Sequence, residues 1–509
     1  MYCGNMGRWI SWWSRVDPNQ HAVAFEDRRV GYAALNENVN RLANAMRKRL
    51  GVKRGDRVGC LLTNSIPYYE IVFACAKIGS LLVPFNIRLT GREIAHIARD
   101  CAPAVLFTEN RFLPVLASTE GNPPGMRVVN LDDGGVKDLR DEGSPQEPED
   151  QARWEDDFAV LYTSGTTGFP KGAVLSQQNI LAVTHNMIAA FGHSRHDRFL
   201  LQLPLCFTGA LIPLSMPVLH AGGTVFLEKD FVPARSLELI EKEKITLSCG
   251  VPTLWKRVSD EAGFAAADFS SLRLILCGGA PVPTRLLRTY NEKGVPFTAG
   301  YGLTEGGGFN MYLPPDQATR KSGGYIPLLW NDVRAVGEEG RAVLPGEIGE
   351  IVIKGPPVMR GYWKNPGATR ETIRDDWLYT GDLARIDEEG YFYIVDRAKD
   401  MIVSGGLNTY PAEIENVIDS FPRVSQAAVI GLPHEVWGEM VTAVVVPKPG
   451  EAIEEGELIA FCRERLADYK CPKRVLVSEA LPLSASGKVL KRLLREKYSG
   501  HAGHFDLGD

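Results

Sequence analysis

The sequence lacks the features that mark several common classes of protein. No uninterrupted apolar run is long enough to span a membrane, and the first twenty residues contain no apolar core of a secretory signal. The nine cysteines are scattered and contain no Cys-x-x-Cys pair, so reduced and mostly buried thiols are expected. A net charge of −5 argues against a dedicated nucleic-acid-binding protein, which would have a basic surface. We therefore expect a cytoplasmic protein without a membrane span.

The length and the order of the segments predict an α/β protein with more than one domain. At 509 residues the chain is too long for a single core. Residues 32–51 have helical spacing, residues 56–63 resemble a buried strand, and residues 66–79 are helical again. This alternation predicts layered α/β structure with largely parallel sheets.

Further along the chain, several segments can be assigned individually. Residues 134–157 are polar and acidic and could form either a domain linker or a surface loop. Ser176 is a candidate cap for a helix that follows it. The other expected elements are strand 272–277, helix 284–293, strand 295–299, helix 412–421, strand 425–430, strand 441–446 and helix 457–466. The part after residue 398 is long enough for a separate small α+β domain, so we expect domains at 1–398 and 399–509.

The stretch TSGTTGFPKG at residues 163–172 indicates a phosphate-binding loop. Glycines allow the backbone to approach a ligand closely, and hydroxyls with free N–H groups suit phosphate oxygens. The stretch is not a P-loop, because Lys171 follows Pro170 and Gly172 stands where Ser or Thr is required. A merely flexible loop would not explain a lysine placed directly after a proline.

A second unusual stretch is GYGLTEGGG at residues 300–308. Gly300 and Gly302 resemble a dinucleotide fingerprint, but Glu305 stands where that pattern needs glycine. The stretch could be a tight turn alone. As a functional motif it offers Tyr301 to stack on a base, Thr304 to contact a phosphate, and Glu305 to ligate Mg²⁺.

Two further stretches carry candidate binding groups. YTGD at residues 379–382 places Asp382 on a glycine turn, where its carboxylate could accept two ribose hydroxyls, and Arg397 lies at the end of a later strand. LPLSASGKVLKR places Lys488 on a glycine turn near the C-terminus, although a lysine of this kind taken alone would be an ordinary surface residue.

Together these motifs resemble the adenylate-forming superfamily, which includes acyl-CoA synthetases, luciferases and nonribosomal adenylation domains. YTSGTTGFPKG resembles its phosphate loop, GYGLTE its aromatic-Thr-Glu motif, YTGD its ribose motif, GYFYIVDRAKDMIVSGGLNTYPAEIE its hinge region, and SASGKVLK its C-terminal lysine motif. The resemblance spans essentially the whole chain. It implies a large α/β N-terminal domain with a small β-barrel-like subdomain, followed by a small mobile α+β domain. It also implies an AMP-forming acyl-CoA synthetase that uses ATP, Mg²⁺ and coenzyme A.

The resemblance assigns a role to each matching residue. The β- and γ-phosphates would be held by Thr163, Ser164, Gly165, Thr166, Thr167, Gly168 and Lys171. The adenosine and α-phosphate would be bound by Gly279, Ala280, Pro281, Gly300, Tyr301, Gly302, Thr304, Asp382 and Arg397. Glu305 would ligate Mg²⁺, and Lys488 would bridge the substrate carboxylate and the α-phosphate. Lys399 would be the hinge, and Ser404, Gly405, Gly406 and Trp437 would contact coenzyme A, with simple packing an equal alternative for Trp437.

One departure from the family pattern concerns the substrate. In LPLCFTGAL, Phe207 stands where relatives often have a histidine that gates the acyl pocket. Phenylalanine makes the pocket mouth more apolar, and Gly300, Gly306, Gly307 and Gly308 would leave room for the substrate. We therefore expect an apolar aliphatic or aryl carboxylic acid as the substrate.

Several alternatives remain open at this point. The chain could be a stand-alone acyl-AMP ligase that loads a carrier protein, whereas a nonribosomal module is disfavoured because no carrier domain follows residue 509. A nucleotide-binding scaffold without turnover is a further alternative, although such proteins usually lose the charged groups that are present here. The sequence is compatible with a monomer or a homodimer.

Overall fold

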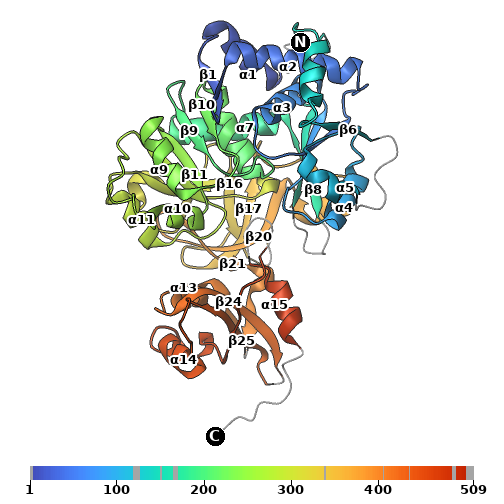
Figure 1. Cartoon of the computed structure of the whole chain (residues 1–509). Coiled ribbons are helices and arrows are strands. Elements are labelled where there is room, and N and C mark those ends of the chain that lie inside the picture. Colours follow the sequence, from blue (N-terminus) through green and yellow to red (C-terminus); the bar gives the residue numbers. More distant parts are fainter. Residues whose placement is uncertain are drawn as a thin grey trace. The chain divides into compact units, whose positions relative to one another are not determined.

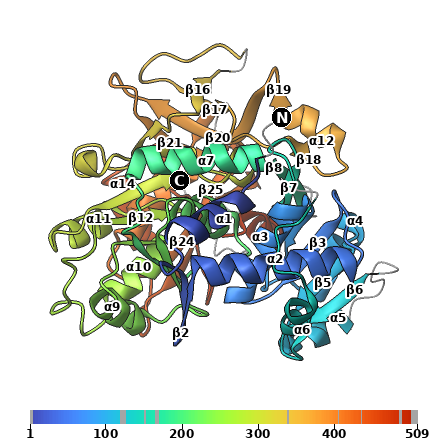
Figure 2. The ribbon, with the colours of Figure 1, turned by 90° about the horizontal axis from the view of Figure 1, so that it is seen from above.

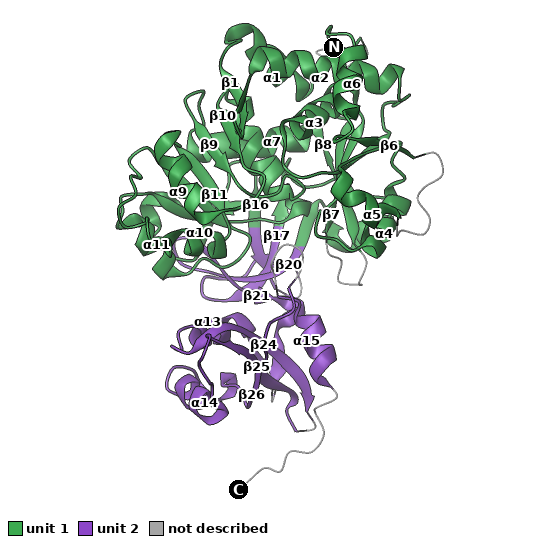
Figure 3. Ribbon diagram, viewed as in Figure 1, with its two compact units in different colours: residues 1–333, 353–379 green, residues 334–352, 380–509 purple. Residues whose placement is uncertain are grey.

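The chain forms two compact units. The computed structural model describes residues 4–117, 126–149, 152–163, 170–337, 340–404, 406–434, 436–483 and 489–499. Unit 1 comprises residues 1–333 and 353–379, and unit 2 comprises residues 334–352 and 380–509 (Figure 3). The boundary expected after residue 398 lies inside unit 2. Because compactness does not locate a hinge, that boundary stays a prediction.

Unit 1 contains a long sheet that is parallel through its centre (Figure 1). Five neighbouring pairings are parallel: β1 with β10, β10 with β9, β9 with β11, β11 with β12, and β12 with β13. In spatial order the strands are β15 (Gly324–Pro327), β14 (Met311–Tyr312), β13 (Phe297–Tyr301), β12 (Leu274–Gly278), β11 (Leu247–Gly250), β9 (Arg198–Leu201), β10 (Thr224–Leu227), β1 (His21–Phe25) and β2 (Arg28–Gly31). Strands β10 and β11 are buried along their length, as parallel strands covered on both faces are.

A second sheet in unit 1 carries the stem of the candidate phosphate loop. Its strands are, in spatial order, β18 (Gly361–Tyr362), β8 (Lys171–Ser176), β7 (Asp157–Thr163), β4 (Leu81–Pro84), β3 (Arg57–Leu61), β5 (Val105–Thr108) and β6 (Arg127–Asn130). The β3, β4, β5 and β6 pairings are parallel, whereas β7 and β8 form an antiparallel hairpin. The hairpin therefore places the two ends of the loop opposite one another.

Helices and short helical turns surround these sheets. They are α1 (Gly7–Val16), α2 (Tyr32–Lys48), α3 (Ile66–Ile78), α4 (Gly91–Cys101), η1 (Asn110–Phe112), α5 (Leu113–Ala117), α6 (Gly135–Glu142), α7 (Gln177–Phe191), η2 (Ala210–Ser215), α8 (Met216–His220), α9 (Pro233–Lys242), α10 (Pro252–Ser259), α11 (Thr284–Asn291), η3 (Thr304–Gly306), η4 (Pro315–Gln317) and α12 (Pro366–Thr372). Helix α1 packs beside α2 (Figures 1 and 2). Separate apolar cores pack α9, α10 and α11 against the first sheet and α4 and α5 against the second.

Most of the helix assignments made from the sequence are confirmed. Ser176 caps α7 in a reciprocal capping box with Asn179, which satisfies backbone donors at the start of the helix. The expected helices 32–51, 66–79 and 284–293 correspond to α2, α3 and α11. The prediction for residues 134–157 is wrong in part, because residues 135–142 form α6, whose Val136 and Leu139 are buried. The helix was not predicted because its two buried apolar side chains give only a weak periodic pattern in an otherwise acidic stretch.

Unit 2 is built mainly from antiparallel strands. Strand β20 (Trp377–Ile386) pairs antiparallel with β21 (Phe392–Arg397). Strand β19 (Ile373–Arg374) lies in unit 1, and β16 (Asp332–Val336), β17 (Ile348–Lys354) and β20 each lie partly in unit 1 and partly in unit 2. The remaining elements of unit 2 are η5 (Ala398–Asp400), β22 (Ile402–Ser404), β23 (Leu407–Thr409), α13 (Pro411–Asp419), β24 (Val424–His434), β25 (Gly438–Pro447), α14 (Glu455–Arg463), η6 (Asp468–Lys470), β26 (Arg474–Val477) and α15 (Lys491–Tyr498). One face of the β24–β25 sheet packs on α13 and α14 and the other on α15, which gives the expected small α+β arrangement.

Tryptophan and cysteine side chains both contribute to the interior of the protein. Trp9 and Trp13 are buried on α1 and Trp12 is half exposed, so this helix uses two of its tryptophans in packing. The eight cysteines that the structure describes are free and buried. Among the described residues, no helix is both long enough and apolar enough to cross a membrane.

Candidate active site

The stem of the candidate phosphate loop is formed by the last residue of β7 and the first residue of β8. Thr163 and Lys171 are directly paired across the hairpin. Both side chains are partly buried. Of the residues expected in the loop itself, Ser164, Gly165, Thr166, Thr167 and Gly168 lie outside the described residues. The described stem therefore fixes where the loop leaves and re-enters the sheet.

Glu305 lies next to this stem, although 142 residues separate it from Thr163 in the sequence. It belongs to the short turn η3, which follows β13. Thr163 Oγ1 donates a hydrogen bond to Glu305 Oε1 at 3.1 Å, and Tyr362 OH donates to the same oxygen at 2.9 Å. Burial and the neighbouring Glu305 carboxylate raise the pKa of the Tyr362 phenol well above its usual value, so Tyr362 is a hydrogen-bond donor here.

The ammonium group of Lys171 faces the same tyrosine. Lys171 Nζ lies 5.5 Å from the centre of the Tyr362 ring, within the range of a cation–π contact. Tyr362 thus contacts two of the nominated catalytic residues, one through its hydroxyl and one through its ring. The sequence did not single it out, because a tyrosine in a two-residue strand carries no motif of its own.

Thr304, the second nominated residue of η3, contacts the segment that carries Phe207. The hydroxyls of Thr304 and Thr208 are 2.9 Å apart. Phe207 is half buried and its backbone N–H donates to Pro204 O at 3.1 Å. Thr208 was also missed from the sequence, since its partner lies 96 residues further along the chain.

The residues nominated for adenine lie at the carboxyl ends of two neighbouring parallel strands. Gly278 of β12 is in register with Gly300 of β13, so the turn 279–281 and Tyr301 emerge at the same edge of the sheet. The turn is exposed, and Gly279 has φ +79°, a conformation that favours glycine. Ligands commonly bind at this edge of an α/β sheet.

Gly300 and Gly306 are required by packing within the protein. A Cβ on Gly300 would lie 1.9 Å from the Phe309 ring, and one on Gly306 would lie 2.4 Å from the Asn310 side chain. Asn310 is fully buried and donates a hydrogen bond to Gly306 O at 2.7 Å. The two glycines therefore let β13 and η3 approach the chain that follows them. Their role toward a substrate stays a prediction.

In unit 2, Asp382 and Arg397 form an ion pair across β20 and β21. Arg397 Nε lies 3.0 Å from Asp382 Oδ1, and the two residues are in register. The Asp382 side chain is largely buried whereas that of Arg397 is half exposed. Thr380 Oγ1 accepts a hydrogen bond from Asp382 N at 3.1 Å and donates to Ile351 O at 2.8 Å, which fixes the turn. Lys399 is exposed in η5.

The residues nominated for coenzyme A lie on two neighbouring strands of unit 2. Ser404 is buried at the end of β22 and is in register with Gly438 of β25, directly after Trp437. The Trp437 ring is half buried and stacks on His434 with centroids 4.5 Å apart. Gly406 is exposed, and Gly405 and Lys488 lie outside the described residues.

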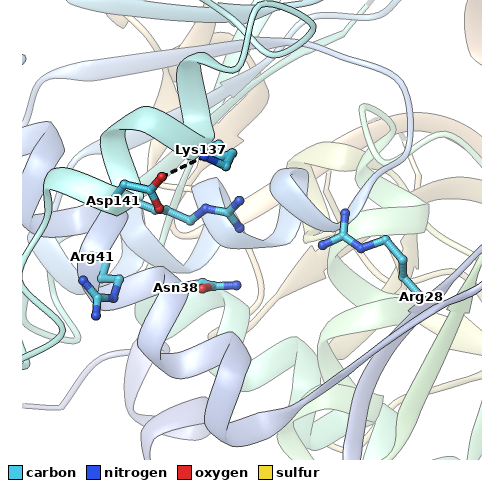
Figure 4. Close-up of a pocket in the computed structure, with 6 residues that line it drawn as sticks. Arg28, Asn38, Arg41, Lys137 and Asp141 are labelled. Atoms are coloured by element: carbon cyan, nitrogen blue, oxygen red, sulfur yellow. Dashed lines mark hydrogen bonds and ion pairs between the residues drawn. The ribbon is translucent and has the colours of Figure 1, made fainter.

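A basic cavity lies elsewhere in unit 1, on α2 and α6 (Figure 4). It measures about 490 Å³ and is lined by Arg28, Asn38, Arg41, Lys137, Arg140 and Asp141. Lys137 pairs with Asp141, Arg41 with Glu37, and Arg140 with the buried carboxylate of Glu70. Most of its positive charge is therefore already balanced, and none of the nominated residues lines it.

The chemistry of the site fits Mg²⁺ that arrives with a nucleotide. Among the described residues, no group of three or more His, Cys, Asp and Glu side chains could hold a metal ion by itself. Glu305 supplies one carboxylate beside several hydroxyls. Mg²⁺ is commonly bound in this way, by one or two carboxylates together with substrate phosphates and water.

Comparison with known proteins identifies the family. Residues 10–363 match the AMP-binding enzyme family, and residues 413–488 match the AMP-binding enzyme C-terminal domain. The chain is 41% identical to a feruloyl-CoA synthase of Amycolatopsis sp., over 97% of this chain and 99% of the relative. It is 38% identical to an indoleacetate–CoA ligase of Aromatoleum aromaticum, over 96% of this chain and 98% of the relative.

Solved structures give the same result. ATP-bound MatB from Rhodopseudomonas palustris superimposes with a TM-score of 0.90 at 31% identity, covering 98% of this chain and 100% of that one. O-succinylbenzoate coenzyme A synthetase from Bacillus subtilis, in complex with ATP and magnesium ion, has a TM-score of 0.87 at 31% identity, covering 96% and 98%. The chain belongs to the AMP-binding enzyme family.

Membership of this family defines the reaction. The protein is an AMP-forming acid–thiol ligase, which joins a carboxylic acid to coenzyme A through an acyl-AMP intermediate at the expense of ATP. It uses Mg²⁺ with ATP. The expected fold, with a large α/β N-terminal part and a small C-terminal domain, is confirmed by the same comparisons.

Proposed function

We propose that this ligase activates an apolar aryl carboxylic acid of the hydroxycinnamate type. The observation that carries the proposal is the uncharged surroundings of the glycines after Glu305. The neighbours that a Cβ on these glycines would meet are Val183, Thr208, Asn310, Pro213 and Pro357. No charged side chain is among them to pair with a second carboxylate. The 41% identity to a feruloyl-CoA synthase supports the same substrate class.

In the first half-reaction, the substrate carboxylate attacks the α-phosphate of ATP and pyrophosphate leaves. A carboxylate is a poor acyl donor because its leaving group would be oxide, whereas AMP leaves readily. Because charge develops on the phosphate oxygens, catalysis depends on positioned donors and positive charge. We propose that Thr163, the loop 164–168 and Lys171 hold the β- and γ-phosphates, and that Thr304 contacts the α-phosphate.

The remaining ATP-binding roles follow the family pattern. Tyr301 and the turn 279–281 would sandwich the adenine, and Asp382 with Arg397 would bind the ribose. Mg²⁺, held by Glu305, would neutralise charge on the phosphates. Lys488 would bridge the carboxylate and the α-phosphate. The ion pair of Asp382 with Arg397 supports the ribose assignment, since it fixes the position of the carboxylate, which is a hydrogen-bond acceptor.

In the second half-reaction, the thiol of coenzyme A attacks the acyl carbon and AMP leaves. We propose Ser404, Gly405, Gly406 and Trp437 for coenzyme A and Lys399 for the hinge between domains 1–398 and 399–509. The exposed side chains of Val403, Leu407 and Val436 near these residues support contact with an apolar arm of the acceptor. Phe207 would gate the acyl pocket by a change of rotamer.

The cell compartment and the oligomeric state are also part of the proposal. Eight free buried cysteines in the described residues are compatible with a reducing compartment, so we propose the cytoplasm. We propose a monomer or a homodimer, which size-exclusion chromatography with light scattering would distinguish.

A panel of acids tests the proposed substrate. The purified protein would be assayed with Mg·ATP and coenzyme A on ferulic acid, indole-3-acetic acid, octanoic acid, palmitic acid and 2-succinylbenzoic acid, following AMP release and thioester mass. Ferulic acid should have the highest kcat/KM, at least about tenfold above octanoic acid, as differences in pocket contacts allow. Preference for a fatty acid or for the dicarboxylic acid would contradict the proposal. Acyl-AMP without thioester would instead indicate a carrier protein as the acceptor.

A further inference from the structure

Tyr362 contacts both of the charged groups that are proposed to act on the triphosphate. Its hydroxyl donates to Glu305 Oε1 at 2.9 Å, and its ring lies 5.5 Å from Lys171 Nζ. Thr163 donates to the same carboxylate oxygen. Oε1 therefore accepts two hydrogen bonds, whereas no described residue donates one to Oε2.

The segment that carries Tyr362 is fixed on both sides of the site. Its strand β18 pairs antiparallel with β8, with Tyr362 in register with Ala173. Trp363 N donates to Gly172 O at 2.7 Å, and Met359 N donates to Glu305 O at 2.8 Å. The segment thus connects the phosphate-loop stem to the backbone of η3 and holds the Tyr362 ring in place.

Such contacts determine the orientation of a carboxylate. Two donors on one oxygen fix the carboxylate plane and leave the other oxygen to bind a cation. Partners that hold a metal ligand in this way commonly change metal affinity or activity when they are removed. The aromatic face meanwhile attracts the ammonium group, which restricts the position of a long, flexible side chain.

We propose that Tyr362 is a positioning residue that orients the Glu305 carboxylate for Mg·ATP and places the Lys171 ammonium group. The inference rests on the proposed roles of Glu305 and Lys171. Tyr362 does not react with substrate. It acts through the two side chains that it contacts.

Replacing the hydroxyl and the ring separately tests the two contacts. Tyr362→Phe removes only the hydroxyl and keeps the ring beside Lys171, whereas Tyr362→Leu removes both. Tyr290→Phe is the matched control, because its hydroxyl is also buried and donates at 2.7 Å, but to Trp255 O in a distant core. Mn²⁺ would serve as the probe, with its binding to the protein–ATP complex followed by electron paramagnetic resonance.

Tyr362→Phe should weaken Mn²⁺ binding in the ATP complex by about tenfold, while Tyr290→Phe leaves it unchanged. Tyr362→Phe should also lower kcat for acyl-AMP formation and raise KM for Mg·ATP, because weaker metal binding in the ATP complex weakens binding of Mg·ATP to the protein. Tyr362→Leu should raise KM for ATP further, by about two- to fivefold over Tyr362→Phe, because the ring contact with Lys171 is lost. Thermal melting of each variant would separate these effects from loss of folding.

Two outcomes would overturn the inference, and the variant Glu305→Gln separates it from the proposed role of Glu305. If Mn²⁺ affinity in Tyr362→Phe equals that of the parent or exceeds it, Tyr362 does not orient the metal ligand. If KM for ATP is the same in Tyr362→Leu and Tyr362→Phe, the ring does not position Lys171. If Glu305→Gln also leaves Mn²⁺ binding unchanged, the proposed role of Glu305 itself is wrong.

Discussion

At the scale of single residues, the described part of the site contains few charged groups and many hydroxyls. Thr163 and Tyr362 both donate hydrogen bonds to Glu305, and the Tyr362 ring faces the Lys171 ammonium group. Phosphate transfer needs little covalent participation by the protein, so a site of fixed donors around one carboxylate and one lysine suits the reaction. The hydroxyls position the charged groups rather than react themselves.

A partly buried histidine, His220, makes the stability of unit 1 sensitive to acid. Burial, and to a lesser extent the neighbouring His185, lower the pKa of His220 from 6.5 to about 4. The His220 ring lies 4.7 Å from Trp9 and 5.5 Å from His185. Because the unfolded chain binds a proton near pH 6.5 and the folded protein does not, the unfolding free energy falls as the pH decreases from 6.5 to 4.

We expect His220→Phe to remove part of this acid sensitivity. The ring is kept for packing against Trp9, but the titrating group is lost. When the pH is lowered from 7 to 4, the unfolding free energy of both proteins falls, and the decrease should be about 2 kcal/mol smaller for the variant than for the parent. Urea unfolding at several pH values measures this difference. His196→Phe, at an exposed position, is the control. The prediction would be contradicted if the unfolding free energy of His220→Phe had the same pH dependence as that of the parent.

At the scale of secondary-structure elements, close packing after β13 gives η3 its position. Strand β13 ends at Tyr301, and the chain then turns back so that the Phe309 ring lies against Gly300. The Asn310 amide holds the carbonyl of Gly306, next to Glu305. Thus the position of Glu305, the nominated magnesium ligand, depends on the side chains of Phe309 and Asn310, which follow η3 in the sequence.

The contact between Gly300 and Phe309 leads to a stability prediction. Gly300→Ala should lower the unfolding free energy by about 1–3 kcal/mol, because its Cβ overlaps the ring and the strand must shift. Phe309→Leu lacks the outer ring atoms that the added Cβ would overlap. Gly300→Ala should therefore lower the unfolding free energy by at least about 1 kcal/mol less in the Phe309→Leu background than in the parent. Chemical denaturation of the two single variants and the double variant measures the coupling. Additive effects would show that the overlap is not the cause.

The sequence predicted the elements better than the contacts between them. Long periodic segments such as α2 and α3 were recognised because the apolar spacing is strong, and the family motifs led to the correct reaction. Helix α6 was missed because its buried face consists of only two apolar side chains. Tyr362 and Thr208 were missed because their partners are 57 and 96 residues away, and no local pattern reports such a contact.

At the scale of the whole molecule, the motifs are divided between the two units. Unit 1 contains the phosphate-loop stem, η3 and the adenine turn, whereas unit 2 contains the Asp382–Arg397 pair and the candidate residues for coenzyme A. Residues 10–363 match the AMP-binding enzyme family and residues 413–488 match its C-terminal domain, so Asp382, Arg397 and Ser404 lie between the two matched ranges. The chain therefore carries matches to both parts of the family, and the two half-reactions follow from its membership.

Transfer of an oxygen atom from the acid to AMP is the most direct test for the acyl-AMP intermediate. The acid preferred in the substrate panel would be prepared with ¹⁸O in both carboxylate positions and incubated with the protein, Mg·ATP and coenzyme A. Attack of the carboxylate on the α-phosphate transfers one labelled oxygen to AMP and leaves the other in the thioester, and mass spectrometry of AMP should show a single ¹⁸O. Label in inorganic phosphate together with ADP would contradict an acyl-AMP intermediate, as would thioester formation with unlabelled AMP.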